Sequence, residues 1–266
     1  GDFLSGGDGR SVQEQLKHVQ HVQATQAAFA AILTDGCVVT WGDSMQGGDS
    51  SDVQEQLKNV QHVQATSGDA FAAILANGTV TTWGFPAFGG NSSAVQEQLK
   101  TVQHVQASSG AFAAILADGS VVTWGDPDSG GDSSAVQEQL KNVQRVQATS
   151  GAFAAILADG SVVAWGDPGS GGDSSAVQKQ LTNVQHVQSS WLAFAAILAD
   201  GSITTWGDPE TGGDSSAVQE QLKTVQHVNA TSGAFAAVLA DGSIVTWGSR
   251  HHGGDSSVVQ EQLNSL

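Results

Sequence analysis

The chain has 266 residues, enough for a substantial core, and its 33 glycines indicate frequent turns. Nine Lys and Arg against 26 Asp and Glu give a formal net charge of −17, which repels phosphate backbones and anionic lipid surfaces. We therefore expect no nucleic acid among its partners. The single Cys37 excludes an intrachain disulfide. We expect no membrane insertion, because no apolar run approaches spanning length.

A Trp-Gly pair recurs along the chain at a nearly fixed spacing. The tryptophans are Trp41, Trp83, Trp124, Trp165, Trp206 and Trp247, spaced by 42 and then four times by 41 residues. A fixed period near forty residues is typical of a repeat array. The sequence therefore predicts a single domain over residues 1–266, made of six repeats of about 41 residues and a partial terminal repeat.

Each repeat opens with a segment such as DSSAVQEQL, residues 132–140, whose structure the sequence leaves ambiguous. Ser before Gln and Glu is typical of a helix N-cap, and Val136, Leu140 and Val143 follow helical spacing. We interpret the segment as a short turn of helix or an irregular stretch. The following residues, KNVQRVQAT at 141–149, have valines three apart and form a weaker strand candidate, in which a bulge would explain the spacing.

The rest of each repeat predicts a β-hairpin. AFAAIL, residues 111–116 in the third repeat, is apolar on both alternating faces, as expected of a strand covered on each side. SVVTW, residues 120–124, supplies β-branched and aromatic residues for a second strand. Asp118-Gly119 lies between them and is typical of a type I′ turn. Because Trp124 ends this strand, as its counterparts end theirs, we expect these six tryptophans to be buried between sheets.

Two architectures stack such units, a β-propeller and an open solenoid. An all-β propeller accounts better for strands that are apolar on both faces. Six blades fit six whole repeats, with seven blades or an open solenoid as alternatives. Residues 248–266 repeat the segment at 1–19, so one terminal copy is surplus in a six-bladed ring. We expect one copy to complete the first blade, and the sequence leaves open which one does so.

The pattern V-x-x-V-x-A-x-x-G, followed by an apolar strand, A-D-G-S-V-V and T-W-G, resembles the repeat of the regulator of chromosome condensation family over essentially the whole chain. The arrays are also similar to repeat proteins predicted from dinoflagellate genomes. The family resemblance implies a β-propeller, usually of seven blades, and members that act in guanine-nucleotide exchange, ultraviolet-B reception and ubiquitin ligation. Ala111-Phe112 replaces the family's His-Thr, and Gly-Gly-Asp replaces its Gly-Gln-Leu-Gly. Exchange activity therefore does not carry over.

No catalytic constellation, metal site or cofactor is predicted. Histidines recur at one position of the VQHVQ strand candidates, but they lack the close spacing of metal motifs. Asp126, Asp128 and Asp132 are spaced like turn residues and lack the bidentate Glu of a calcium loop. Cys37 is a lone thiol at a position held by Ser or Thr in other repeats. We expect the protein not to be an enzyme.

Three loops break the repeat symmetry and are the candidate binding residues. Trp191 and Leu192 replace the Ser-Gly of other repeats, a Phe-Pro-Ala-Phe segment replaces an Asp-Pro loop, and Ser-Arg-His-His is the only locally basic version. The candidate partner-binding or ligand-binding residues are Phe85, Phe88, Trp191, Leu192, Arg250, His251 and His252.

The copied repeat favours a rigid framework whose specificity lies in these divergent loops. The sequence predicts a non-enzymatic protein-interaction scaffold or accessory subunit with other proteins as partners. One alternative is a lectin-like binder of small ligands in repeated clefts between blades. A guanine-nucleotide exchange or ubiquitin-ligase-associated module, by family analogy, is a third.

Overall fold

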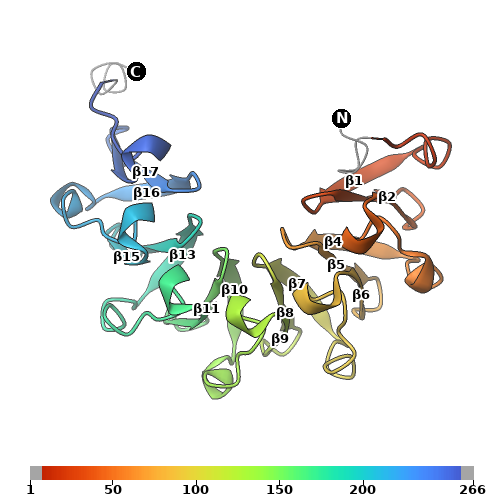
Figure 1. The fold of residues 1–266 in the computed structure, drawn as a ribbon. Helices are drawn as coiled ribbons and strands as arrows, with labels where there is room; N and C mark the ends of the chain where they lie inside the picture. Colours follow the sequence, from red (N-terminus) through yellow and green to blue (C-terminus); the bar gives the residue numbers. More distant parts are fainter. Residues whose placement is uncertain (1–7, 259–266) are drawn as a thin grey trace. The chain divides into compact units, whose positions relative to one another are not determined.

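The structure, a computed structural model, describes residues 8–258. The chain divides into two compact units, residues 1–137 and residues 138–266. Figure 1 shows the strands of the first unit in red to yellow-green and those of the second unit in green to blue. The predicted single domain over residues 1–266 stays a prediction.

Within the described residues each unit contains three sheets of three strands, and each sheet comes from one repeat. In the first unit the strands are β1 (Val19–Ala24), β2 (Ala28–Leu33), β3 (Val38–Gly42), β4 (Val60–Ala65), β5 (Ala70–Leu75), β6 (Val80–Gly84), β7 (Val102–Ala107), β8 (Ala111–Leu116) and β9 (Val121–Gly125). In the second unit they are β10 (Val143–Ala148), β11 (Ala152–Leu157), β12 (Val162–Gly166), β13 (Val184–Ser189), β14 (Ala193–Leu198), β15 (Ile203–Gly207), β16 (Val225–Ala230), β17 (Ala234–Leu239) and β18 (Ile244–Gly248).

Every sheet is an antiparallel meander whose middle strand is the AFAAIL segment, or AFAAVL in β17, paired on both sides. In the second to fifth repeats its small alanines and single Phe are buried, as expected of a strand covered on both faces. The valine-rich segment forms the first strand, so the weaker strand prediction is confirmed. Its register shifts between Val143 and Arg145, which is the bulge that the three-residue valine spacing requires.

The hairpin between the second and third strands is confirmed, but the type I′ turn is wrong. In the third repeat Gly119 N donates to Leu116 O (2.9 Å) and Leu116 N donates to Ser120 O (2.9 Å). Gly119 has φ +78°, whereas Asp118 is not among the described residues of positive φ. The connection is therefore a three-residue loop, a type I turn closed by a left-handed glycine. Asp118 serves instead as a side-chain acceptor for Ser120 N (2.9 Å).

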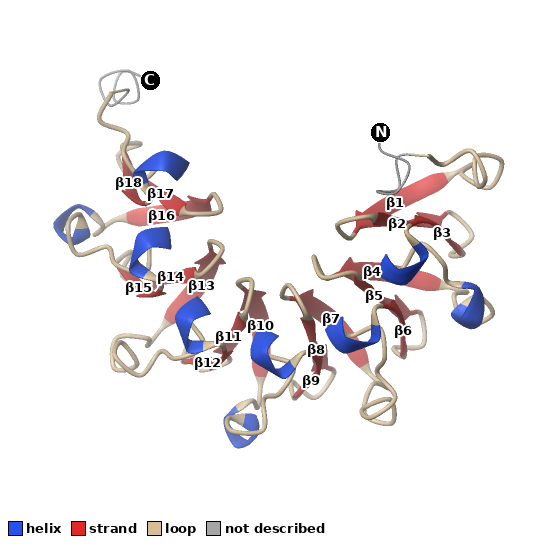
Figure 2. Cartoon of the chain, in the orientation of Figure 1, coloured by secondary structure: helices blue, strands red, loops and turns tan. Residues whose placement is uncertain are grey.

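Only short 3-10 helices accompany the strands in the described part of the chain (Figure 2). They are η1 (Ser44–Gln46), η2 (Ser51–Val53), η3 (Pro86–Phe88), η4 (Pro127–Ser129), η5 (Gln137–Gln139), η6 (Pro168–Ser170), η7 (Pro209–Thr211), η8 (Gln219–Gln221) and η9 (Arg250–His252). The SSAVQEQL segments are turns and single 3-10 turns, as interpreted from the sequence. None of these helices is long and apolar enough to cross a membrane.

A Ser-x-x-x-Gln pair fixes each of these segments to its sheet. In the segment after β15, Ser215 Oγ donates to Gln219 Oε1 (2.8 Å), and Gln219 Nε2 donates to Ile203 O (2.9 Å) at the start of β15. Equivalent pairs occur at Ser50 and Ser92. The recurring serine and glutamine are therefore structural, because they satisfy a carbonyl at the strand end.

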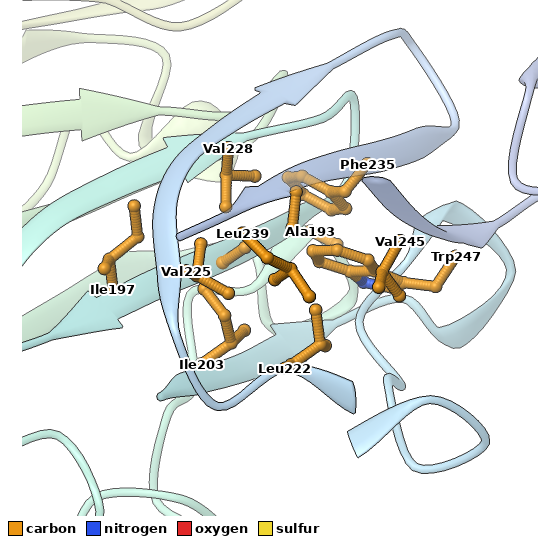
Figure 3. Close-up of a cluster of buried hydrophobic side chains, with 12 residues drawn as sticks. Ala193, Ile197, Ile203, Leu222, Val225, Val228, Phe235, Leu239, Val245 and Trp247 are labelled. Atoms are coloured by element: carbon orange, nitrogen blue, oxygen red, sulfur yellow. The ribbon is translucent and has the colours of Figure 1, made fainter. Parts of the chain in front are cut away.

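The core lies in the junctions between consecutive sheets of a unit. β14 packs against β16, and the buried cluster between them joins Ala195 and Ile197 on one sheet to Phe235 and Trp247 on the other. Figure 3 shows the ring of Trp247 beside Phe235 and Val245, with Ala193 and Ile197 on the neighbouring sheet. The rings of Phe235 and Trp247 are stacked with centroids 5.2 Å apart.

The first glycine of the Gly-Gly pair at 212–213 completes this junction. Trp247 Nε1 donates to Gly212 O (3.0 Å) of the preceding repeat. Gly212 has φ +103°, and a Cβ there would lie 2.5 Å from Cδ2 of Phe235. Only glycine fits, because the backbone is left-handed and the aromatic ring rests on it.

The predicted burial of the tryptophans is confirmed for five of the six. The buried ones are Trp83, Trp124, Trp165, Trp206 and Trp247. Trp41 in the first repeat is half-buried. Its ring still stacks on Phe29, with centroids 5.1 Å apart.

Six sheets within residues 8–258 match the six repeats counted in the sequence. The prediction that one terminal copy completes the first blade depends on residues 1–7 and 259–266, which lie outside the described residues.

Candidate interaction loops

Trp191 lies in a loop whose backbone is held on both sides. In the second unit the loops between the first and second strands of each repeat, residues 149–151, 190–192 and 231–233, form what we call the ladder loops. Ser150 N donates to Trp191 O (2.8 Å), and Trp191 N donates to Ser232 O (2.9 Å). The Trp191 side chain nevertheless remains 56% exposed. A large aromatic group is thus presented to solvent from a fixed backbone.

Acidic side chains flank this loop. Asp208 N donates to Leu192 O (3.0 Å), which places the Asp208 turn beside the half-buried Leu192. On the other side, Gly151 lies against the turn of Asp167, whose Cβ is 3.3 Å from the position of a Cβ on that glycine. Glu210 is exposed on η7, two residues after Asp208. The Trp191 loop therefore lies beside an acidic turn, and so does its neighbour at Gly151.

The basic loop of the last repeat reaches the same ladder loops. A Cβ on Gly233 would lie 2.8 Å from Nδ1 of His252, and Gly233 directly follows the Ser232 that accepts from Trp191 N. Thr231 Oγ1 also donates to His252 O (2.8 Å). Arg250 is exposed and pairs with Asp255 (3.1 Å). The structure thus brings the Trp191 loop and the basic loop to one end of the second unit.

Phe85 and Phe88 occupy the corresponding end of the first unit. Their rings lie 5.1 Å apart at 48°, and both side chains are half-buried. Phe88 fills the space beside Gly68 and Gly110, whose Cβ positions would be 2.9 and 3.1 Å from its ring. Phe88 therefore has a packing role between the loops at Gly68 and Gly110, whereas Phe85 borders a cleft of about 400 Å³ that Met45, Val53 and Trp83 also line.

Asp69 is a feature of the first unit that the sequence analysis missed. It is the extra residue of the 42-residue spacing and has φ +83°, unusual for a residue with a Cβ. Burial raises the pKa of its carboxyl, and the nearby Asp43 adds to the effect. Its Oδ1 and Oε1 of Gln46 are both buried without a hydrogen-bond partner in the described structure.

The recurring histidines lie on the first strands. In the first unit the rings of His21 and His62, on β1 and β4, have centroids 6.3 Å apart. Burial lowers the pKa of His62, and the imidazoles of His21 and His104 lower it further. Within residues 8–258, no three His, Cys, Asp or Glu side chains gather into a group that could hold a metal ion.

The other residues considered for chemistry have structural surroundings. Asp126 accepts from Asp128 N (3.3 Å) and from Ser129 Oγ (2.6 Å), which is N-capping of η4 rather than a calcium arrangement. Burial raises the pKa of the Cys37 thiol, which disfavours the reactive thiolate.

No protein-family model matches the chain, and no curated protein is similar to it in sequence. Solved structures share its fold. Yeast RCC1 (Prp20), in a structure with Kap60, has a TM-score of 0.54 at 14% identity and covers 90% of this chain and 72% of its own. Prp20p from Saccharomyces cerevisiae has a TM-score of 0.54 at 15% identity, over 90% and 74%. Human WBSCR16 has a TM-score of 0.54 at 14% identity, over 85% and 75%.

These likenesses show the fold. The chain is an all-β propeller of the RCC1 kind, with six blades in residues 8–258. The prediction of propeller blades rather than a solenoid is confirmed. The similarity to dinoflagellate repeat proteins stays a prediction.

Proposed function

We propose that the chain is a non-enzymatic protein-interaction scaffold whose contact surface in the second unit is the loop surface, defined as Trp191, Leu192, Arg250, His251 and His252. The observation that carries the proposal is the 56% exposure of Trp191 on a backbone held by hydrogen bonds from both sides. Aromatic side chains are frequent anchors of protein interfaces, and a fixed loop loses little entropy on binding.

The charges around the loop surface indicate the chemistry of the partner. The Asp208 turn borders the Trp191 loop and the Asp167 turn borders the neighbouring loop at Gly151, in a chain of net charge −17. A complementary protein surface has an apolar pocket for Trp191 and basic side chains around it. Electrostatic attraction of this kind raises association rates and weakens as salt is added.

Similar solved structures support a protein partner. Yeast RCC1 (Prp20) was solved bound to Kap60, and Prp20p was studied for its binding to Gsp1p and histones. These partners belong to those proteins. What we transfer is only the general use of a propeller, the binding of other proteins. Nucleic acid is not proposed as a partner, because the net charge opposes it.

The test restores the ordinary loop in place of the divergent one. Trp191→Ser combined with Leu192→Gly gives the Ser-Gly found at Ser150-Gly151, so we expect the double variant to fold, which circular dichroism checks. The immobilised wild-type chain should capture a set of proteins that the double variant loses, and capture should fall as salt rises. Met45→Ala is the matched control, since it removes another exposed apolar side chain, 69% accessible, from the first unit. Equal capture by all three chains would refute the proposal.

The cleft beside Phe85 supports a second candidate, a small-ligand site. Its volume of about 400 Å³ lies in the range of ligand pockets, and it combines aromatic walls with Ser and Asp side chains. Calorimetric titration with oligosaccharides tests it. Phe85→Asp, which restores the residue found at Asp126, should abolish any heat of binding, and an unchanged titration would exclude the cleft.

A further inference from the structure

One cleft of the first unit contains several departures from the repeat. It is the cleft of about 400 Å³ beside Phe85, which residues of η1, η2 and η3 line together. The residues that line it are described and belong to the first unit, so the cleft does not depend on how the two units are placed. Met45, Asp52 and Phe85 are all in its lining. At the corresponding positions around η4 the chain has Asp128, Ala135 and Asp126. Three departures from the repeat thus meet in one cleft.

The apolar part of the lining is held in place. The Phe85 ring packs on Phe88 with centroids 5.1 Å apart, and Phe88 is itself wedged between two loop glycines. The Met45 side chain is 69% exposed, but its backbone N donates to Asp43 Oδ1 (2.8 Å) at the start of η1. The face of an aromatic ring attracts a cation, and a thioether is a soft, polarisable contact for an alkyl chain. This part of the lining therefore suits an alkyl chain that ends in a cation.

The polar part of the lining carries negative charge. Asp49 Oδ1 accepts from Ser51 N (2.9 Å), and this backbone hydrogen bond lowers the pKa of the Asp49 carboxyl, which is therefore ionised at neutral pH. Asp52 lies exposed in η2. None of the described lining residues is Lys, Arg or His, and Lys58, the next cation along the chain, pairs with Glu55 (2.6 Å). The cleft therefore has two carboxylates and no cation in its described lining.

We propose that this cleft binds a small organic cation, an ammonium or guanidinium group on a short alkyl chain. The carboxylates of Asp49 and Asp52 attract the charge, and Phe85 and Met45 contact the alkyl chain. The volume of about 400 Å³ is near the lower end of the range for ligand pockets, which suits a molecule of this size. The proposal rests on the second candidate function, the small-ligand site beside Phe85, and specifies its ligand class.

Met45 gives a direct readout, because it is the only methionine in the sequence. A chain labelled with carbon-13 in its methionine methyl group has one methionine signal in a nuclear magnetic resonance spectrum, and that signal comes from the cleft. The probe is butylguanidinium, and the neutral butylurea and the anionic pentanoate are comparison ligands of similar shape. Butylguanidinium should shift the Met45 signal to saturation, and both comparison ligands should bind at least about threefold more weakly, as expected when an exposed ion pair is lost.

Asp52→Ala restores the residue found at Ala135. It should weaken the binding of butylguanidinium about threefold to fivefold and leave that of butylurea unchanged. Asp128→Ala is the matched control, since it removes an exposed carboxylate of the same unit that is not in the lining of the cleft. Circular dichroism checks folding, and Asp52→Asn replaces Asp52→Ala if that variant does not fold. A capped arginine peptide presents the same guanidinium group on a protein backbone and should bind no more tightly than butylguanidinium.

The results that would overturn the proposal are distinct from one another. If butylurea bound as tightly as butylguanidinium, if only an oligosaccharide shifted the Met45 signal, or if Asp52→Ala bound butylguanidinium like the wild type, the cleft would be a ligand site that does not select cations. If the arginine peptide bound more tightly than butylguanidinium, the ligand would be a side chain of a protein. If neither butylguanidinium nor an oligosaccharide shifted the signal, the second candidate function would fail together with this inference.

Discussion

Replacing Trp206 tests the energetics of the junctions, because its surroundings are fully defined within the second unit. The side chain is 4% exposed, stacks on Phe194 at 5.1 Å, and donates from Nε1 to Gly171 O (3.0 Å). Trp206→Ala empties this site and should cost about 3–5 kcal/mol, as expected of a large buried aromatic side chain. Trp206→Phe preserves an aromatic ring but leaves the Gly171 carbonyl unpaired, which should cost about 1–3 kcal/mol.

Trp191→Ala is the matched control, since the same residue type lies 15 positions earlier with an exposed side chain. It should change stability by no more than about 0.5 kcal/mol. Urea unfolding followed by circular dichroism orders the three variants. If Trp191→Ala and Trp206→Ala lost the same stability, or if Trp206→Phe matched the wild type, the tryptophan junction would not be the source of stability.

The remaining predictions concern single residues. Gly171→Ala should lower the free energy of unfolding by more than about 1 kcal/mol, because φ is +91° and the new Cβ would lie 2.8 Å from the ring of Phe194. Gly169→Ala, on the same turn, is the control and should leave the urea midpoint unchanged. Because burial lowers the pKa of His62, the unfolded chain takes up that proton first as pH falls below about 6.5. Thermal melts should therefore show that the wild type loses stability between pH 7 and 5 relative to His62→Gln, with His251→Gln as an exposed control. Asp69→Gly should raise the free energy of unfolding by about 0.5–1 kcal/mol, because glycine tolerates the positive φ and the partly buried carboxyl is removed. A urea midpoint below that of the wild type would contradict this prediction.

The parts of the fold that the sequence predicts well depend on local patterns. Three patterns each involve only a few neighbouring residues: the apolar run AFAAIL, the Asp-Gly turn of the hairpin and the valine spacing. The strands that these patterns predict are all present in the structure. The turn type fails because Ala117 is part of the loop, which lets Asp118 keep an ordinary φ and accept from Ser120 N instead. A two-residue motif does not reveal the length of the loop around it.

Contacts between repeats could not be derived from the sequence. The sequence predicts no more than an ordinary turn for the Gly-Gly pair, whereas in the structure Gly212 contacts Phe235 and accepts a hydrogen bond from Trp247, which lie 23 and 35 residues further along the chain. The same holds for the candidate site. Divergence from the repeat identifies Trp191 and His252, but only the hydrogen-bonded ladder loops show that both lie at one end of the second unit.

A photo-crosslinking amino acid at position 191 tests the central claim most directly, which is that the divergent loop on a rigid blade binds a protein. In the full chain, position 191 should yield a covalent adduct with a partner protein, and the yield should fall with added salt. Position 45, which is exposed and apolar in the first unit, should yield none. Adducts of equal yield from both positions, or none from position 191 under conditions where the wild type captures partners, would contradict the account.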